Sequence, residues 1–143
     1  YAKITKDDLA YFDVAMDENV AAIMVGHPIV TGTLNSKGKQ ATVSKEIIEH
    51  LRQSFNGLII TDSINMRGLS WSYFFNKKRI YIDAVKAGND IILDSNLYGC
   101  SSQGIQVCLK DLKKAVHEGE IPEKQIDESV KRILKAKGYE VVY

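Results

Sequence analysis

The chain has 143 residues, of which 45% are hydrophobic and 26% are charged, proportions close to those of globular proteins. A chain of this length buries about 70% of the surface that its unfolded form exposes, so we expect one domain over residues 1–143 rather than a disordered segment. The 19 basic and 18 acidic residues leave a formal net charge of +1, which gives no electrostatic basis for binding nucleic acid, and the apolar runs are too short to cross a bilayer.

The first third of the chain predicts a helix, a strand and a long loop. Apolar side chains at helical spacing predict a helix over residues 7–16. A continuous apolar segment over residues 21–26 predicts a strand that ends at His27. The Gly, Asn, Ser and Lys content of residues 29–42 predicts a loop.

The second predicted strand is the most informative part of the sequence. Ser44 is a suitable N-cap for an amphipathic helix that leads into residues 57–61. This segment is apolar on both faces, as in parallel sheets that are covered on both sides, and it ends at Asp62. Because ligands bind at the carboxyl ends of parallel strands, Asp62 is a candidate functional residue.

The rest of the chain predicts a third strand between helices. Residues 67–77 are irregular and rich in aromatic side chains, which suits a packed surface loop or the wall of a binding cleft. A helix through residues 80–87 ends at Gly88, which suits a left-handed C-cap, and residues 89–93 predict the strand. Two amphipathic helices follow, the last of them after Pro122.

The spacing of these elements predicts an α/β fold. Strands end near His27, near Asp62 and after the third apolar segment, at intervals of roughly 30 to 35 residues with a helix between each pair, which is typical of βαβ units. We expect residues 23–25, 58–61 and 91–93 to be adjacent parallel strands. A complete (β/α)₈ barrel needs roughly 200 to 250 residues. The sequence therefore predicts the C-terminal part of a TIM-type barrel, incomplete in this chain, with about three βα units and a terminal helix.

The cysteines and histidines form no recognisable metal or redox motif. Cys100 and Cys108 lack the spacing of such a pair and are expected to be reduced thiols. His27, His50 and His117 are scattered, so their spacing builds no zinc site. We therefore expect no metal and no cofactor, with His50 and His117 on helix surfaces.

Five segments, taken in order, carry a family resemblance. They are AIMVGH (22–27), ATVSKEIIEHLR (41–52), GLIITDSINM (57–66), AGNDIIL (87–93) and IDESVKRILKAK (126–137). Together they resemble the C-terminal half of the N-terminal barrel domain of glycoside hydrolase family 3, in particular its bacterial β-N-acetylglucosaminidase (β-hexosaminidase) branch. The compartment stays open between cytoplasmic and extracytoplasmic.

The resemblance implies a retaining glycosidase whose nucleophile is Asp62, which would attack the anomeric carbon and form a covalent glycosyl-enzyme. The Asp-Ser-x-x-Met form of residues 62–66 favours a β-N-acetylhexosaminidase, which removes terminal β-linked N-acetylglucosamine from a glycan or muropeptide. A β-glucosidase of the same family is the alternative. His27 and Met66 would line the sugar pocket, against the alternatives of a His27 held by backbone hydrogen bonds and a Met66 in the core.

One part of the family's active site has no counterpart in residues 1–143. The family takes its general acid/base from a Lys-His-Phe-Pro-Gly-His-Gly segment on an earlier strand, so the chain alone is predicted to be inactive. One rival interpretation is a non-catalytic module that associates through its open strand edge. Another is a barrel enzyme that uses Asp62 as a general base or metal ligand. Asp90, at the start of a strand, is interpreted as structural.

Overall fold

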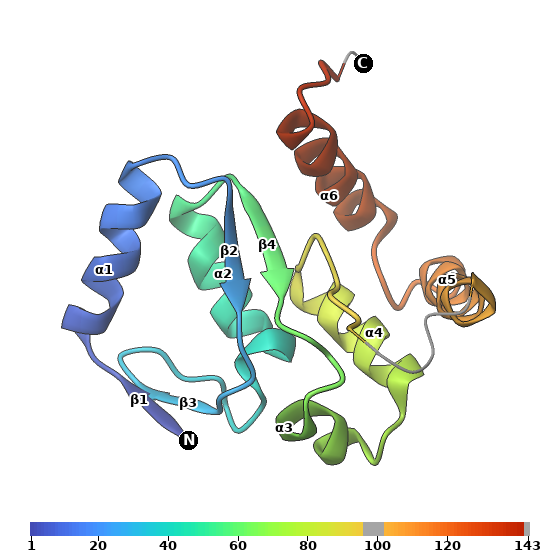
Figure 1. Ribbon diagram of the computed structural model, residues 1–143, viewed down its shortest axis with the longest axis horizontal. Helices are drawn as coiled ribbons and strands as arrows, with labels where there is room; N and C mark the ends of the chain where they lie inside the picture. Colours follow the sequence, from blue (N-terminus) through green and yellow to red (C-terminus); the bar gives the residue numbers. More distant parts are fainter. Residues whose placement is uncertain (96–101, 142–143) are drawn as a thin grey trace.

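The computed structural model describes residues 1–95 and 102–141, which form helices around two central parallel strands (Figure 1). The elements, in chain order, are β1 (Ala2–Ile4), α1 (Lys6–Asp17), β2 (Ala22–Val25), β3 (Val30–Gly32), the 3₁₀ helix η1 (Ala41–Val43), α2 (Lys45–Ser54), β4 (Leu58–Thr61), α3 (Arg67–Ser70), the 3₁₀ helix η2 (Trp71–Tyr73), α4 (Lys77–Ala87), α5 (Ser102–His117) and α6 (Glu123–Ala136).

The central strands β2 and β4 pair in parallel, with Ile23 opposite Ile59. On the other side of β4, Ile60 forms one parallel bridge with Ile91. The predicted order of parallel neighbours is therefore confirmed. Residues 91–93, however, do not form the strand that the sequence predicts.

A side chain interrupts this third strand. The backbone N–H of Thr61 donates to the carbonyl oxygen of Ile91 at 3.0 Å. Two residues later, the N–H of Leu93 donates to the hydroxyl oxygen of Thr61 at 2.9 Å instead of to a main-chain carbonyl. Because a strand ladder needs main-chain partners on both sides, the pairing ends after one bridge.

A second parallel pair, β1 and β3, does not follow from the sequence pattern, which predicts a loop over residues 29–42. Ala2 lies opposite Val30 in this pair. Each strand has 3 residues, too few for alternation to show. Gly32 has a φ of 101°, and a Cβ there would lie 2.3 Å from the carbonyl oxygen of Ile4, so the close approach of the two strands requires glycine.

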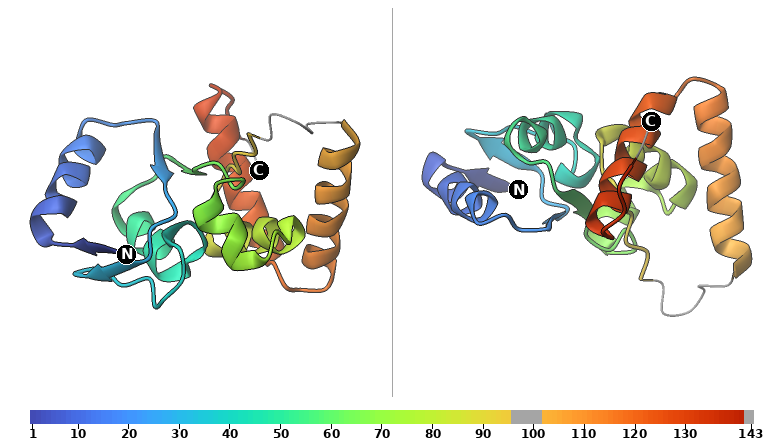
Figure 2. Two further views of the ribbon diagram at one scale, coloured as in Figure 1. Left: turned by 60° about the horizontal axis from the view of Figure 1, so that its bottom comes forward. Right: turned by 90° about the horizontal axis from the view of Figure 1, so that it is seen from above.

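The two faces of the central strands are covered differently. Ile23, Val25 and Ile59 are buried in a cluster that includes residues of α2. Met24 points to the opposite face and is 56% exposed. Both views in Figure 2 show α2 and α4 on one side of the strands. The uncovered face corresponds to the inside of a barrel, as expected for an incomplete one.

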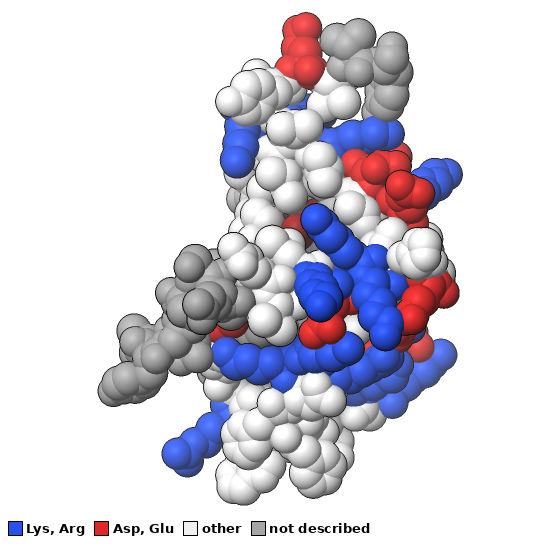
Figure 3. Space-filling view, turned by 90° about the vertical axis from the view of Figure 1, so that its right-hand side faces the viewer, with Lys and Arg blue, Asp and Glu red and all other residues white. Residues whose placement is uncertain are grey.

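The helix α4 packs against α5 and the turn before α6. Ile82, Ala115 and Ile121 form a buried cluster between these elements. The pair of Lys78 and Asp111, 3.0 Å apart, links α4 to α5 at the surface. Charged side chains of both signs gather on this face of the molecule (Figure 3).

Asp90 joins α2, β4 and α6. Its carboxylate accepts the backbone N–H of Ile59 at 2.9 Å, the Nε–H of Arg132 at 2.9 Å and a hydrogen bond from Arg52. The side chain of Asp90 is fully buried. Burial lowers the pKa of Arg52, and the Asp90 carboxylate opposes that shift. These contacts agree with the interpretation of Asp90 as a structural carboxylate.

Residues 67–77 contain the short helices α3 and η2 in place of an irregular loop. The rings of Trp71 and Phe75 have centroids 6.5 Å apart. Phe74 is 90% exposed. Phe74 and Phe75 have φ values of 48° and 61°, in the left-handed region that L-amino acids rarely adopt. This aromatic segment therefore lies on the surface with a costly backbone conformation.

Candidate active site

Asp62 is the first residue after β4 and lies at the carboxyl end of the central strands. Its backbone N–H donates to the carbonyl oxygen of Val25 at 2.9 Å, which extends the pairing of the two strands by one step. Alternation along β4 places Asp62 on the same face as Ile60, the face that would line a barrel.

The carboxylate of Asp62 is half-buried and only partly occupied by hydrogen bonds. One oxygen, Oδ1, accepts the backbone N–H of Ser63 at 2.6 Å. Among the residues that the structure describes, no other group donates to this side chain. One oxygen is therefore oriented by the backbone, and the other is available to a ligand.

The carbonyl oxygen of Ser63, directly after Asp62, is held from two sides. It accepts a hydrogen bond from Nε2 of His27 at 2.8 Å and one from the backbone N–H of Met66 at 3.1 Å. Because a carbonyl oxygen can only accept, Nε2 of His27 carries a proton. The turn that bears Asp62 is thus fixed by the loop after β2 and by the start of α3.

The other ring nitrogen of His27 is also engaged. Its Nδ1 lies 2.7 Å from the hydroxyl oxygen of Thr42, which is itself 2.5 Å from the carbonyl oxygen of Gly26. With both nitrogens in hydrogen bonds, the imidazole ring has one orientation. His27 is therefore a residue that holds the Asp62 turn, which agrees with the alternative interpretation of its role.

Asp94 is a second carboxylate at this edge. It accepts a hydrogen bond from the side-chain amide of Asn65 and one from the hydroxyl of Tyr81 at 2.6 Å, and Nζ of Lys77 lies 3.4 Å away. Burial raises the pKa of Tyr81, and the hydrogen bond to Asp94 raises it further, so this phenol stays protonated as a donor. The contact with Asn65 connects Asp94 to the loop that carries Asp62.

The structure thus brings together His27, Met66 and Asp62, the three site residues that the sequence predicts. Met66 is 50% exposed at the start of α3, so the alternative core position for it is wrong. Sequence reasoning missed Thr42 and Asp94. Asp94 follows the apolar residues 91–93 just as Asp62 follows its strand. This repeated pattern in the sequence indicates a second carboxylate at the same edge.

The remaining candidates for metal or redox chemistry lie elsewhere. His50 is on α2 and His117 ends α5, and neither contacts the Asp62 turn in any described hydrogen bond. Cys108 is a half-buried free thiol on α5, whereas Cys100 lies outside the described residues. Within residues 1–95 and 102–141, no group of three or more His, Cys, Asp or Glu side chains is placed to hold a metal ion.

A comparison with family models assigns the chain. The model of the glycosyl hydrolase family 3 N terminal domain matches residues 1–136. The chain belongs to glycoside hydrolase family 3. In the described part of this family 3 chain, no helix is both long and apolar enough to span a membrane.

The family 3 chain is similar to curated bacterial proteins. The β-hexosaminidase LpqI of Mycobacterium tuberculosis and that of Mycobacterium bovis are each 27% identical over 140 residues, which cover 92% of this chain and 34% of the relative. The chain therefore spans about a third of the length of these relatives.

Solved structures of the family have the same fold. A β-N-acetylglucosaminidase from Paenibacillus sp. FPU-7 superposes with a TM-score of 0.78 at 28% identity, over 99% of this chain and 28% of that one. A family 3 member from Mycobacterium smegmatis gives a TM-score of 0.78 at 25% identity, over 94% of this chain and 40% of that one. The predicted fold class, parallel βαβ units from part of a TIM-type barrel, is confirmed by this similarity.

Proposed function

We propose that Asp62 is the catalytic nucleophile of a retaining β-N-acetylhexosaminidase. The observation that carries the proposal is the carboxylate after β4, which has one oxygen bonded to the N–H of Ser63 and the other without a donor among the described residues. A nucleophilic carboxylate needs a fixed orientation and one accessible oxygen. Attack by that oxygen on the anomeric carbon forms the glycosyl-enzyme, which water then hydrolyses.

The surrounding residues support this role by fixing the turn. His27 and the backbone of Met66 hold the carbonyl oxygen of Ser63, so the residue next to the nucleophile cannot rotate freely. Asn65 is bound to Asp94 from the next segment. The exposed side chain of Met66 offers apolar surface to a sugar ring at the same edge. Such fixed positioning reduces the entropy cost of reaching the transition state.

The relatives suggest the sugar. The similarity to a β-hexosaminidase and to a β-N-acetylglucosaminidase supports terminal β-linked N-acetylglucosamine as the substrate, in a glycan or a muropeptide. No cofactor enters the proposed chemistry. A β-glucosidase would be distinguished by comparing kcat/KM for aryl β-glucoside and aryl β-N-acetylglucosaminide substrates.

The proposal includes a prediction about the isolated chain. The general acid/base would come from another part of the family domain, and its loss alone costs about 10²- to 10⁴-fold in rate. We therefore expect residues 1–143 alone to hydrolyse no aryl N-acetylglucosaminide. Measurable hydrolysis by the isolated chain would contradict this part of the proposal.

The nucleophile is tested in a polypeptide that contains this chain within a complete family domain. A slow fluorinated N-acetylglucosamine substrate should label Asp62, as mapped by mass spectrometry of the digested protein. The Asp62→Gly variant should be inactive, and azide should restore turnover with formation of the α-glycosyl azide, because a small anion replaces the missing nucleophile. Label on another residue, or full activity of Asp62→Ala, would refute the assignment.

A second candidate role is association of this chain with another chain. The uncovered face of β2 exposes 56% of Met24, and among the described strands β2 pairs with β4 alone, so it is an edge strand. Self-association through this face would cover both. Sedimentation velocity at micromolar concentration tests it, and a single species near the chain mass of 16.0 kDa would count against it.

A further inference from the structure

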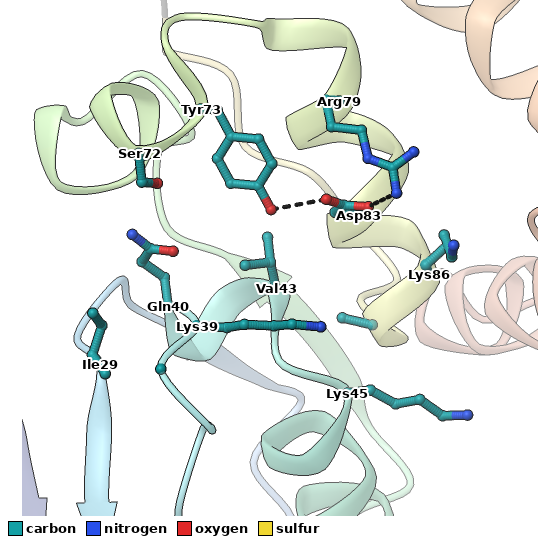
Figure 4. Close-up of a pocket in the computed structure, with 12 residues that line it drawn as sticks. Ile29, Lys39, Gln40, Val43, Lys45, Ser72, Tyr73, Arg79, Asp83 and Lys86 are labelled. Carbon is teal, nitrogen blue, oxygen red and sulfur yellow. Dashed lines mark hydrogen bonds and ion pairs between the residues drawn. The ribbon is translucent and has the colours of Figure 1, made fainter.

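A cavity of about 570 Å³ lies between the loop after β2 and the helix α4, separate from the Asp62 turn (Figure 4). The short helix η1 lies between the cavity and the Asp62 turn. Thr42 of η1 contacts His27, whereas its neighbour Val43 lines the cavity. The cavity lies within the range of about 300 to 1,000 Å³ that is usual for small-molecule sites.

The cavity lining carries an excess of positive charge. Lys39, Lys45, Arg79 and Lys86 line it together with one carboxylate, Asp83. These cations come from three parts of the chain: the loop before η1, the start of α2, and α4. Positive groups that converge from separate elements create a local potential that attracts an anion.

One wall of the cavity is already neutral, because the carboxylates of Asp83 and Glu120 balance Arg79 and Lys86. The carboxylate of Asp83 accepts a hydrogen bond from the hydroxyl of Tyr73 at 3.0 Å and pairs with Arg79 at 2.6 Å. Burial raises the pKa of Tyr73, and the negative charge of Asp83 raises it further, so the phenol remains a donor. Arg79 also pairs with Glu120 at 2.6 Å, which fixes its guanidinium group from both sides. The two carboxylates and the two cations therefore leave no net charge on this wall.

Lys39 and Lys45 have charge left for a ligand. No described side chain pairs with Lys39. The partner of Lys45 is Glu49 at 3.4 Å, and both side chains are more than 60% exposed, so this pair contributes little. Lys86 lies 3.2 Å from Glu120, which it shares with Arg79. Figure 4 shows Lys39 and Lys45 extending in the same direction below Lys86.

We propose that this cavity binds a small ligand that bears a phosphate group. Ammonium groups on flexible stems act as point charges and can surround a tetrahedral oxyanion, whereas a planar carboxylate is better matched by a free guanidinium group. Arg79, the one guanidinium among the described residues of the lining, is already paired. The apolar side chains of Ile29 and Val43 leave part of the lining for a ring or carbon chain. The proposal does not depend on the role of Asp62.

Isothermal titration calorimetry of the chain in low-salt, phosphate-free buffer tests the site with inorganic phosphate. We expect a saturable one-to-one isotherm with phosphate and no binding heat with neutral N-acetylglucosamine. The Lys39→Ala/Lys45→Ala variant should bind phosphate about tenfold or more weakly, because two charge-assisted contacts are lost. Lys113→Ala, which removes an exposed lysine of α5 outside the cavity, should bind within about twofold of the unmodified chain.

Two further titrations identify the source of the phosphate group. Tighter binding of N-acetylglucosamine 6-phosphate than of inorganic phosphate would assign the site to a phosphorylated sugar, and equal binding would assign it to free phosphate. Circular dichroism establishes that the variants are folded, and Lys39→Arg should retain binding. The proposal is overturned by the absence of saturable binding, by equal weakening in Lys113→Ala, or by acetate binding as tightly as phosphate.

Discussion

Nε2 of His27 donates a hydrogen bond to the carbonyl oxygen of Ser63 at 2.8 Å, and this contact joins the ends of two neighbouring strands. His27 follows β2, and Ser63 follows Asp62 at the end of β4. The orientation of the Asp62 carboxylate, which is bonded to the N–H of Ser63, therefore depends on His27, a residue 36 positions before Ser63 in the sequence.

Replacement of His27 by Ala should lower kcat about tenfold in a protein with the complete family domain, with a smaller effect on KM. The physical reason is the loss of a hydrogen bond of about 1.5 kcal/mol that orients the turn, since 1.4 kcal/mol corresponds to a factor of ten in rate. Steady-state kinetics with an aryl N-acetylglucosaminide measure both constants. His117→Ala at the exposed end of α5 is the matched control and should leave both unchanged. Unchanged kinetics in His27→Ala would argue against a positioning role.

Replacement of Asp90 by Asn should lower the free energy of unfolding by about 3 kcal/mol or more. The change leaves Arg52 and Arg132 without their shared anion, and breaking a buried ion pair on one side typically costs 3 to 5 kcal/mol. Urea unfolding followed by circular dichroism measures this difference. The control is Glu49→Gln, which removes the exposed pair with Lys45 and should cost less than about 1 kcal/mol. Similar effects of the two variants would show that the buried ion pairs contribute little.

The contacts of Glu120 predict a pH dependence of stability. Hydrogen bonds from Arg79 and Lys86 hold the pKa of the Glu120 carboxyl below the ordinary value of 4.5. A carboxyl whose folded-state pKa is depressed stabilises the fold above its unfolded pKa, and this contribution is lost as the pH falls through the folded pKa. The unmodified chain should therefore lose more stability than Glu120→Gln between neutral pH and pH values below 4.5.

Urea midpoints at neutral and acidic pH measure this effect in both proteins. The difference between them should be largest at neutral pH and should shrink on acidification. Glu140→Gln, near the C-terminal end of the described chain, serves as the control. A difference between the chain and Glu120→Gln that stays constant with pH would mean that these ion pairs do not contribute.

The strand ends could be predicted because their signal is local. Apolar residues that precede Asp62 and His27 define where each strand stops, and the parallel order follows from helices of sufficient length between them. Thr42 gave no such signal. Its hydroxyl meets His27 only because the loop after β2 folds back over 15 positions, a contact that depends on tertiary structure.

The prediction of a third strand was wrong for a related reason. Residues 91–93 have the apolar composition of a strand. The hydroxyl oxygen of Thr61, however, accepts the hydrogen bond from the N–H of Leu93, and the strand ladder ends there. Propensity cannot report such competition between a side chain and the main chain. The cavity near α4 could not be predicted from the sequence either. Lys39 and Lys86 are distant in sequence, and only the packing of α4 beside η1 places both in its lining.

Replacement of Phe74 by Gly should raise the free energy of unfolding by about 0.5 to 1 kcal/mol. Phe74 has a φ of 48° and a ψ of 39°, and the left-handed region costs an L-residue about 1 to 2 kcal/mol that glycine avoids. The extra chain entropy of glycine in the unfolded state offsets part of this gain. Because the phenyl ring is 90% exposed, its removal loses little buried surface.

Urea unfolding also measures this change, with Phe12→Gly as the control. Phe12 lies within α1 and is 48% exposed, so glycine there should destabilise the chain by about 1 kcal/mol or more through lost helix propensity and lost buried apolar surface. The two glycine substitutions should therefore have opposite signs. If Phe74→Gly instead destabilises the chain as much as Phe12→Gly does, the exposed ring must make contacts that outweigh the strain of its backbone.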